Sequence, residues 1–86
     1  MIITEQDKLF MREAIRLANE SVERGGGPFG AVIVKDSEIV AGSSNSVTID
    51  NDPTAHAEVN TIREACRKLR TFDLSGCTIY TSCEPC

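Results

Sequence analysis

One stretch in the middle of the chain, residues 51–59, constrains the fold more than any other. It reads Asn-Asp-Pro-Thr-Ala-His-Ala-Glu-Val and contains the only histidine, His56. Asp52 is suited to cap a helix, and Pro53 to occupy its first position, where a missing N–H costs nothing. The pattern predicts a helix that begins at Pro53 and carries His56 and Glu58 in its first turn.

The rest of this predicted helix, as far as Leu69, carries one apolar stripe. Its members recur at intervals of three and four residues: Ala55, Val59, Ile62, Cys66 and Leu69. That spacing places them on one buried face, and the charged residues between them on a solvated face. We expect Cys66 to be buried, because an unpaired cysteine packs as a small hydrophobic side chain.

A first helix is predicted from Glu5 to Arg24. Thr4 and Asp7 form a capping box at its start, and the glycines at 25–27 end it. Its apolar stripe consists of Phe10, Ala14, Leu17, Ala18 and Val22. Because no Lys-Ser/Thr follows the glycines and a strand comes next, they indicate a close approach of the backbone rather than a phosphate-binding loop.

Three strands are predicted by short runs of apolar and β-branched residues. Residues 31–34 and 38–41 form a hairpin around a turn at 35–37, and residues 77–81 form the third strand. Residues 42–51 are polar and read as a loop. The order is helix, strand, strand, helix, strand, so the second and third strands should run parallel. The fold class is therefore α/β, a three-layer α-β-α sandwich with a mixed sheet.

Length and charge limit the function. Eighty-six residues make at most one small domain, and the net charge of −4 favours a small uncharged substrate over a nucleic acid. No run of about 18 apolar residues is present, and the N-terminus lacks the basic and apolar regions of a signal peptide. We expect a cytoplasmic protein with no membrane partner.

The histidine stretch and the last residues together have the composition of a metal site. Ser82-Cys83-Glu84-Pro85-Cys86 follows the third strand. An H-x-E motif followed by P-C-x-x-C is the signature of zinc-dependent base deaminases, in which zinc activates water and the glutamate carries protons. Cys83 and Cys86 also form a C-x-x-C, which is typical of a redox dithiol or a zinc knuckle.

The chain resembles the cytidine/deoxycytidylate deaminase superfamily, and within it the small bacterial guanine deaminases. The resemblance spans nearly the whole chain and is specific in residues 26–32, 51–59 and 80–86. It implies that Zn²⁺ is held by His56, Cys86 and a later cysteine, with Glu58 as the catalytic proton shuttle. It implies no ligand role for Cys83.

The same resemblance implies a substrate and its contacts. Asn45 would hydrogen-bond the base, the backbone at Ala57 and Ser82 would line the pocket, and Phe29 would shape it. The implied reaction converts guanine to xanthine and ammonia through a zinc-bound hydroxide. The expected partner is a small-molecule purine base, and we expect a homodimer.

One departure from the family pattern affects these expectations. The second zinc cysteine, which the pattern separates from Cys86 by two intervening residues, lies outside the sequence. We therefore expect residues 1–86 to be the N-terminal part of a single zinc-dependent deaminase domain, inactive by itself. A tRNA adenosine or cytosine deaminase is the first alternative. A non-catalytic zinc-binding or thiol-redox module that uses Cys83 and Cys86 is the second.

Overall fold

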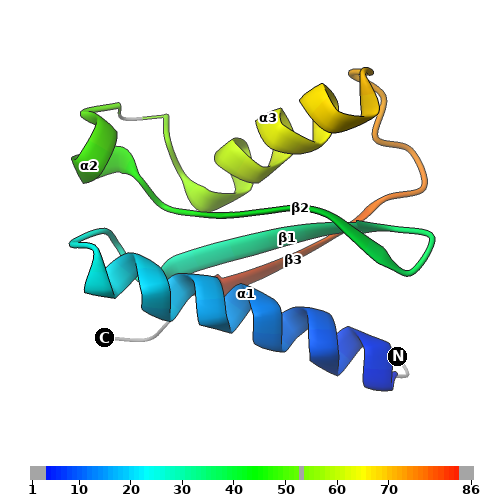
Figure 1. The fold of residues 1–86 in the computed structure, drawn as a ribbon, viewed down its shortest axis with the longest axis horizontal. Coiled ribbons are helices and arrows are strands. Elements are labelled where there is room, and N and C mark those ends of the chain that lie inside the picture. The colour runs from blue at the N-terminus through cyan, green and yellow to red at the C-terminus, as the bar shows by residue number, and fades with distance from the viewer. Residues whose placement is uncertain (1–3, 53, 84–86) are drawn as a thin grey trace.

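The computed structural model describes residues 4–52 and 54–83 and shows two long helices on opposite faces of a three-stranded sheet (Figure 1). The elements in chain order are α1 (Glu5–Glu23), β1 (Phe29–Lys35), β2 (Glu38–Ser44), α2 (Val47–Asp50), α3 (Ala57–Leu69) and β3 (Thr78–Cys83). None of the helices in these ranges is long and apolar enough to cross a membrane.

The sheet has the strand order β2-β1-β3, so β1 is its central strand. β1 pairs with both neighbours in antiparallel fashion. Asp36 and Ser37 form the turn between β1 and β2 with positive φ angles of 52° and 64°, which allow a two-residue hairpin. Strand β2 therefore follows directly from the short turn that the sequence predicts.

The predicted crossover from β2 to β3 is present, but the two strands are not hydrogen-bonded to each other. β2 and β3 run in the same direction, as expected, because both are antiparallel to β1. β1 lies between them, and both hydrogen-bonded strand pairs among the described residues are antiparallel, whereas the sequence predicts a mixed sheet. The predicted three-layer arrangement is confirmed, with α1 on one face and α3 on the other (Figure 1).

Helix α1 packs closely on the sheet because small residues meet there. Ala14, Ala18 and Ser21 are fully buried. A Cβ atom at Gly30 of β1 would overlap the carbonyl oxygen of Ala14, so only glycine allows this approach. The predicted stripe is wrong at its end, since Val22 is 52% exposed and Ser21 takes the buried position.

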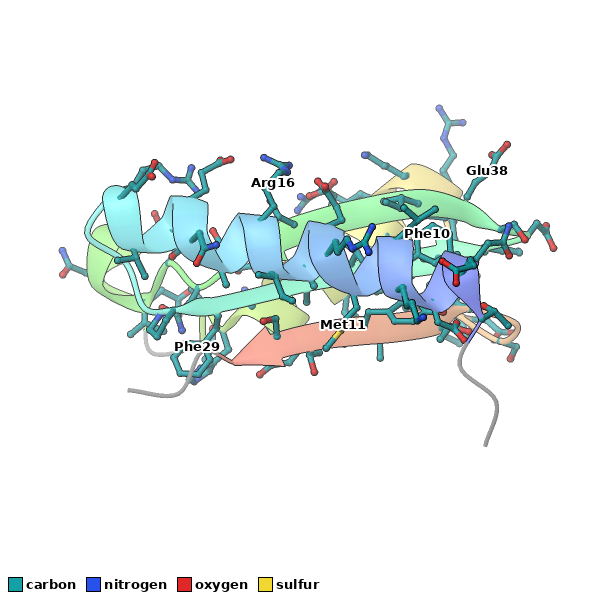
Figure 2. All side chains as sticks on the ribbon, turned by 90° about the horizontal axis from the view of Figure 1, so that it is seen from below. Phe10, Met11, Arg16, Phe29 and Glu38 are labelled. Atoms are coloured by element: carbon teal, nitrogen blue, oxygen red, sulfur yellow. The ribbon has the colours of Figure 1, made fainter. Side chains whose placement is uncertain are left out.

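The N-terminal end of α1 is held by hydrogen bonds and by one aromatic contact. The predicted capping box is confirmed, because Asp7 N donates to Thr4 Oγ1 at 3.1 Å and Thr4 N donates to Asp7 Oδ2 at 3.0 Å. The Tyr80 hydroxyl of β3 donates to Asp7 Oδ1 at 2.5 Å, and its ring lies 5.4 Å from that of Phe10. Figure 2 shows Phe10 near this end of α1 and Phe29 near the opposite end of the molecule.

Helix α3 begins later than predicted. Its N-cap is His56, with φ −72° and ψ 155°, not Asp52. The Asp52 carboxylate instead accepts hydrogen bonds from the Thr54 N–H at 2.9 Å and the Thr54 hydroxyl at 2.7 Å. This local turn competes with helix capping, so the chain stays non-helical up to His56. Pro53 lies outside the described residues.

The buried face of α3 is also rotated from the predicted stripe. Ala57, Thr61 and Ala65 are buried, whereas Ile62 is 41% exposed and Cys66 is only partly buried. Small side chains let α3 approach the sheet, and the Thr61 hydroxyl lies 2.7 Å from the carbonyl oxygen of Ala57 and 3.3 Å from that of Ala31. The face of α3 that is buried is therefore the one whose small side chains allow the helix to approach the sheet closely, not the one with the larger apolar side chains.

The predicted loop at residues 42–51 is partly wrong. β2 continues to Ser44, and the short helix α2 follows from Val47 to Asp50. Asn51 ends it with a left-handed φ of 52°, a conformation that asparagine tolerates. This segment places Asn45 at the end of β2, beside the start of α3.

Candidate active site

A pocket lies where the entrance to β1, the end of β2 and the start of α3 meet. Its volume is about 360 Å³, within the range of small-molecule sites. It is lined by Phe29, Asn45, His56, Ala57 and Glu58. The structure thus brings together, around one cavity, five residues that the sequence analysis singled out from three separate segments.

His56 and Glu58 reach the pocket from the N-terminal end of α3. His56 is the N-cap, its side chain is exposed, and it makes no capping hydrogen bond. Glu58 is the second residue of the helix and is also exposed. Two residues at this spacing point apart in the middle of a helix, but the extended backbone of His56 removes that restriction. The helix end also supplies a positive potential, which favours anionic groups.

Asn45 is the most firmly held polar residue of the pocket and is only 7% exposed. Its side-chain Oδ1 accepts a hydrogen bond from the Val47 N–H at 3.2 Å. Its backbone N–H donates to the Phe29 carbonyl at 3.1 Å. Its backbone carbonyl accepts a hydrogen bond from the buried Ser21 hydroxyl at 3.1 Å. The contact with Val47 orients the carboxamide, and the two backbone contacts fix the segment that carries it in the wall of the pocket.

The glycines before β1 allow this arrangement. A Cβ atom at Gly26 would lie 2.5 Å from Ser21 Oγ and 2.9 Å from the Asn45 carbonyl oxygen. At Gly27 it would lie 3.1 Å from the Phe29 ring and 3.5 Å from Asn45 Oδ1. The close backbone approach predicted for the glycines is confirmed at Gly26, beside the backbone of the pocket residue Asn45.

Comparison with known proteins assigns the family. Residues 4–86 match the model of the cytidine and deoxycytidylate deaminase zinc-binding region. The chain belongs to the cytidine and deoxycytidylate deaminase family. The predicted resemblance to these deaminases is therefore confirmed.

Individual deaminases support this assignment. The guanine deaminase of Bacillus subtilis is 59% identical over 78 residues, which are 90% of this chain and 50% of that protein. A tRNA-specific adenosine deaminase of Aquifex aeolicus is 49% identical over 77 residues, which are 90% of this chain and 51% of that protein. The X-ray structure of the Bacillus subtilis guanine deaminase gives a TM-score of 0.86 at 57% identity and covers 92% of this chain and 51% of that one. The chain spans about half the length of these relatives.

Of the two predicted zinc ligands in this chain, only His56 lies within the described residues. Within residues 4–52 and 54–83, no group of three or more His, Cys, Asp or Glu residues is placed to hold a metal ion. Cys86, the other predicted ligand, lies outside the described residues, and so does the side chain of Cys83. An imidazole free of capping contacts, together with a cysteine thiolate, is a donor set that suits zinc.

Ser82 has a different position from the other predicted contacts. It is 9% exposed, pairs with Gly30 across the sheet, and is not among the residues that line the pocket. The next residue, Cys83, pairs with Phe29. The end of β3 therefore lies beside the entrance of β1, at the same end of the sheet as the pocket.

Two supporting residues were not predicted. In the sequence, Ser21 reads as one more polar position of an amphipathic helix, and Asn60 reads in the same way in α3. The available signal for Asn60 was its low helix propensity inside a helix, which usually needs a local reason.

Proposed function

We propose that this chain forms part of a zinc-dependent hydrolase that converts guanine and water to xanthine and ammonia. The observation that carries the proposal is the pocket that unites Asn45, His56 and Glu58 in a member of the deaminase family. The high identity to a guanine deaminase supports guanine as the substrate.

The pocket offers complementary contacts to a flat, polar base. The Asn45 carboxamide can hydrogen-bond the polar edge of the ring. The N–H of Ala57 belongs to the first turn of α3, so it has no acceptor within the helix and can donate to a base oxygen or nitrogen. The ring of Phe29, 36% exposed, supplies an apolar surface for stacking.

Glu58 is suited to carry the protons of the reaction. Hydrolysis requires one proton of the attacking water to reach a ring nitrogen and the other to reach the amino group, which then leaves as ammonia. A bound zinc ion, held by His56 and Cys86, would supply Lewis acidity that lowers the pKa of water. Glu58 lines the same pocket as His56 and can accept and return these protons as a general base and acid.

A tRNA adenosine deaminase is the second candidate, because one such enzyme is 49% identical to this chain. Tight binding of tRNA usually requires a basic surface. The net charge of −4 therefore favours a free base.

Zinc content and ammonia release test the proposal. Both are measured in the 86-residue chain and in a version extended past Cys86, with guanine and with tRNA. Because a catalytic zinc usually has three protein ligands, we expect turnover only in the extended version. Ammonia from guanine supports the proposal, and ammonia from tRNA alone would favour the second candidate. If neither version binds zinc, the proposal is wrong, and the thiols of Cys83 and Cys86 would become the site to test.

A further inference from the structure

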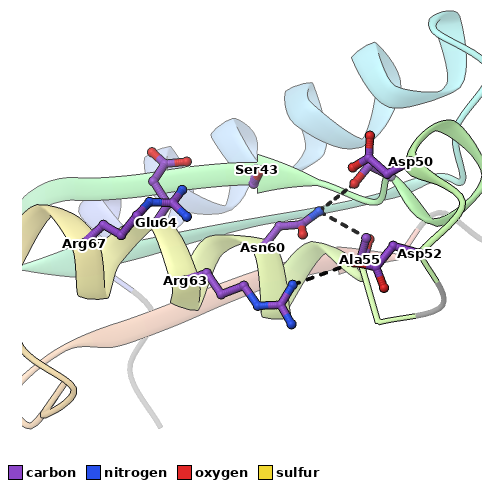
Figure 3. Close-up of a pocket in the computed structure, with 9 residues that line it drawn as sticks. Ser43, Asp50, Asp52, Ala55, Asn60, Arg63, Glu64 and Arg67 are labelled. Atoms are coloured by element: carbon purple, nitrogen blue, oxygen red, sulfur yellow. Dashed lines mark hydrogen bonds and ion pairs between the residues drawn. The ribbon is translucent and has the colours of Figure 1, made fainter.

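Asn60 joins the two segments that carry the pocket residues. It lies on the first turns of α3 and is partly buried. Its Nδ2 is 2.9 Å from the carbonyl oxygen of Ser44, 3.2 Å from that of Ala55 and 3.0 Å from the hydroxyl of Ser46. Figure 3 shows the Asn60 side chain reaching from α3 to the segment at Ala55.

These partners are the immediate neighbours of the pocket residues. Ser44 and Ser46 flank Asn45, and Ala55 precedes His56. The Ser46 N–H also donates to the carbonyl of Ala55 at 2.9 Å, so the two segments are in direct contact. The Asn60 carboxamide reinforces that junction from the helix.

The chemistry of the contacts requires an amide at this position. Two of the three partners are backbone carbonyl oxygens, which only accept hydrogen bonds. An NH₂ group can donate to both, whereas an aspartate of the same shape would oppose its oxygens to theirs. Asn60 does not line the pocket of His56 and Glu58, so its influence on that pocket is indirect.

We propose that Asn60 is a positioning residue that holds Asn45 and His56 at a fixed separation, so that a base and the metal ligand meet in one geometry. The inference rests on the proposed function, because it assigns Asn45 to the base and His56 to zinc. Misplacement of reacting groups by about 1 Å can cost about 100-fold in rate. Loss of the Asn60 contacts should therefore reduce catalysis more than it reduces stability.

The test compares Asn60→Asp with Asn19→Asp in the zinc-loaded, extended protein. Asn19 is exposed on α1, so its replacement introduces the same charge away from the pocket. Three quantities are measured: the zinc content, kcat/KM with guanine, and the hydrogen-exchange rate of the Ser46 amide relative to amides of β1. Asn60→Ala removes the donor without adding charge and replaces Asn60→Asp if that variant does not fold.

We expect Asn60→Asp to retain zinc, to lose at least about tenfold in kcat/KM and to exchange the Ser46 amide at least about tenfold faster, with β1 amides little changed. Asn19→Asp should match the wild type. An unchanged Ser46 exchange rate would overturn the proposal, and so would faster exchange with kcat/KM within about twofold of wild type. If the wild type releases no ammonia from guanine, the proposed substrate is wrong, and the exchange rates alone decide the role of Asn60.

Discussion

Two pockets of similar size lie on different sides of α3, and their charged residues are used differently. The first contains His56 and Glu58. Neither side chain makes a hydrogen bond or an ion pair with any of the described residues. The second, of about 310 Å³, holds five charged residues (Figure 3). These are Asp50, Asp52, Arg63, Glu64 and Arg67.

Several charged groups of the second pocket are committed to one another or to nearby residues. Arg63 lies 3.9 Å from Asp52 and donates to the Thr54 hydroxyl at 3.3 Å, and Glu64 pairs with Lys68 at 3.0 Å. Hydrogen bonds from Thr54, with a smaller effect of Arg63, hold the pKa of Asp52 below its usual value. The number of charges therefore does not identify a site. What distinguishes the first pocket is that it combines a histidine with a carboxylate, and neither side chain has a hydrogen-bond or ion-pair partner among the described residues.

The largest expected effect separates two glutamates of the same helix. Glu58→Gln in the extended chain should reduce kcat by at least about 100-fold, because it removes the general base and acid while keeping the shape. The melting temperature should stay unchanged, since Glu58 is exposed. Glu64→Gln is the matched control and should keep kcat within about twofold, with a stability loss of about 0.5 kcal/mol or less from the ion pair to Lys68. Equal losses of kcat in both variants would remove the distinction between the pockets.

A second substitution separates substrate binding from local structure. Asn45→Asp retains an oxygen that can accept from the Val47 N–H but removes the amide donors. We expect kcat/KM for guanine to fall by about 10- to 100-fold with zinc content unchanged, since each lost hydrogen bond to a buried group costs about 1–3 kcal/mol. Steady-state kinetics and metal analysis of the same samples check this. An unchanged KM and kcat would mean that Asn45 does not contact the base.

The glycines test whether the first pocket depends on close backbone packing. Gly26→Ala should lower the free energy of unfolding by about 1–3 kcal/mol, because the added methyl meets Ser21 and the Asn45 backbone. Gly27→Ala should cost less, since its nearest neighbour is the ring of Phe29, which can rotate. Denaturant unfolding of the two variants measures the difference. A larger loss in Gly27→Ala would contradict the packing described for Gly26.

The smallest expected effect lies at the far end of the molecule, where a titratable group has only a structural role. The hydrogen bond from Tyr80, more than those from Thr4, holds the pKa of Asp7 below its ordinary value. A carboxylate with a lowered folded-state pKa stabilises the fold above its unfolded-state pKa, and this contribution is lost as the pH falls through the folded-state pKa. Tyr80→Phe should therefore lose less stability than the wild type between about pH 6 and about pH 3.

Urea unfolding at several pH values tests the Tyr80 prediction, and kcat of the extended Tyr80→Phe chain should remain within about twofold of wild type. A steeper loss of stability in acid for the variant would show that the Tyr80 contact does not lower the Asp7 pKa. A large loss of kcat would instead indicate that this end of α1 affects the pocket.

Local rules predicted the elements whose signals are local. The capping box at Thr4, the hairpin around residues 35–37 and the end of α1 at the glycines follow from short-range chemistry. The start of α3 did not, because the Asp52 carboxylate bonds to Thr54 instead of capping the helix. The buried face of α3 depends on contacts such as that between Thr61 and Ala31, thirty residues apart, which no local pattern contains.

The candidate site shows the same division. His56 and Glu58 could be predicted from their spacing and Asn45 from the family resemblance. The described pocket brings these three together with Phe29 and Ala57. Asn60 could not be predicted as a positioning residue, because its partners lie 5 to 16 positions away in the sequence. The roles of these residues remain predictions that the substitutions above decide.

The most direct measurement compares His56→Ala and Glu58→Gln for zinc content and ammonia release from guanine in the extended protein. If His56 is a metal ligand and Glu58 a proton carrier, replacing each residue should have a different effect on zinc content and turnover. His56→Ala should lose both zinc and turnover, whereas Glu58→Gln should keep zinc at the wild-type stoichiometry and lose turnover. Undiminished turnover in either variant would contradict the assignment of this pocket as the deaminase site.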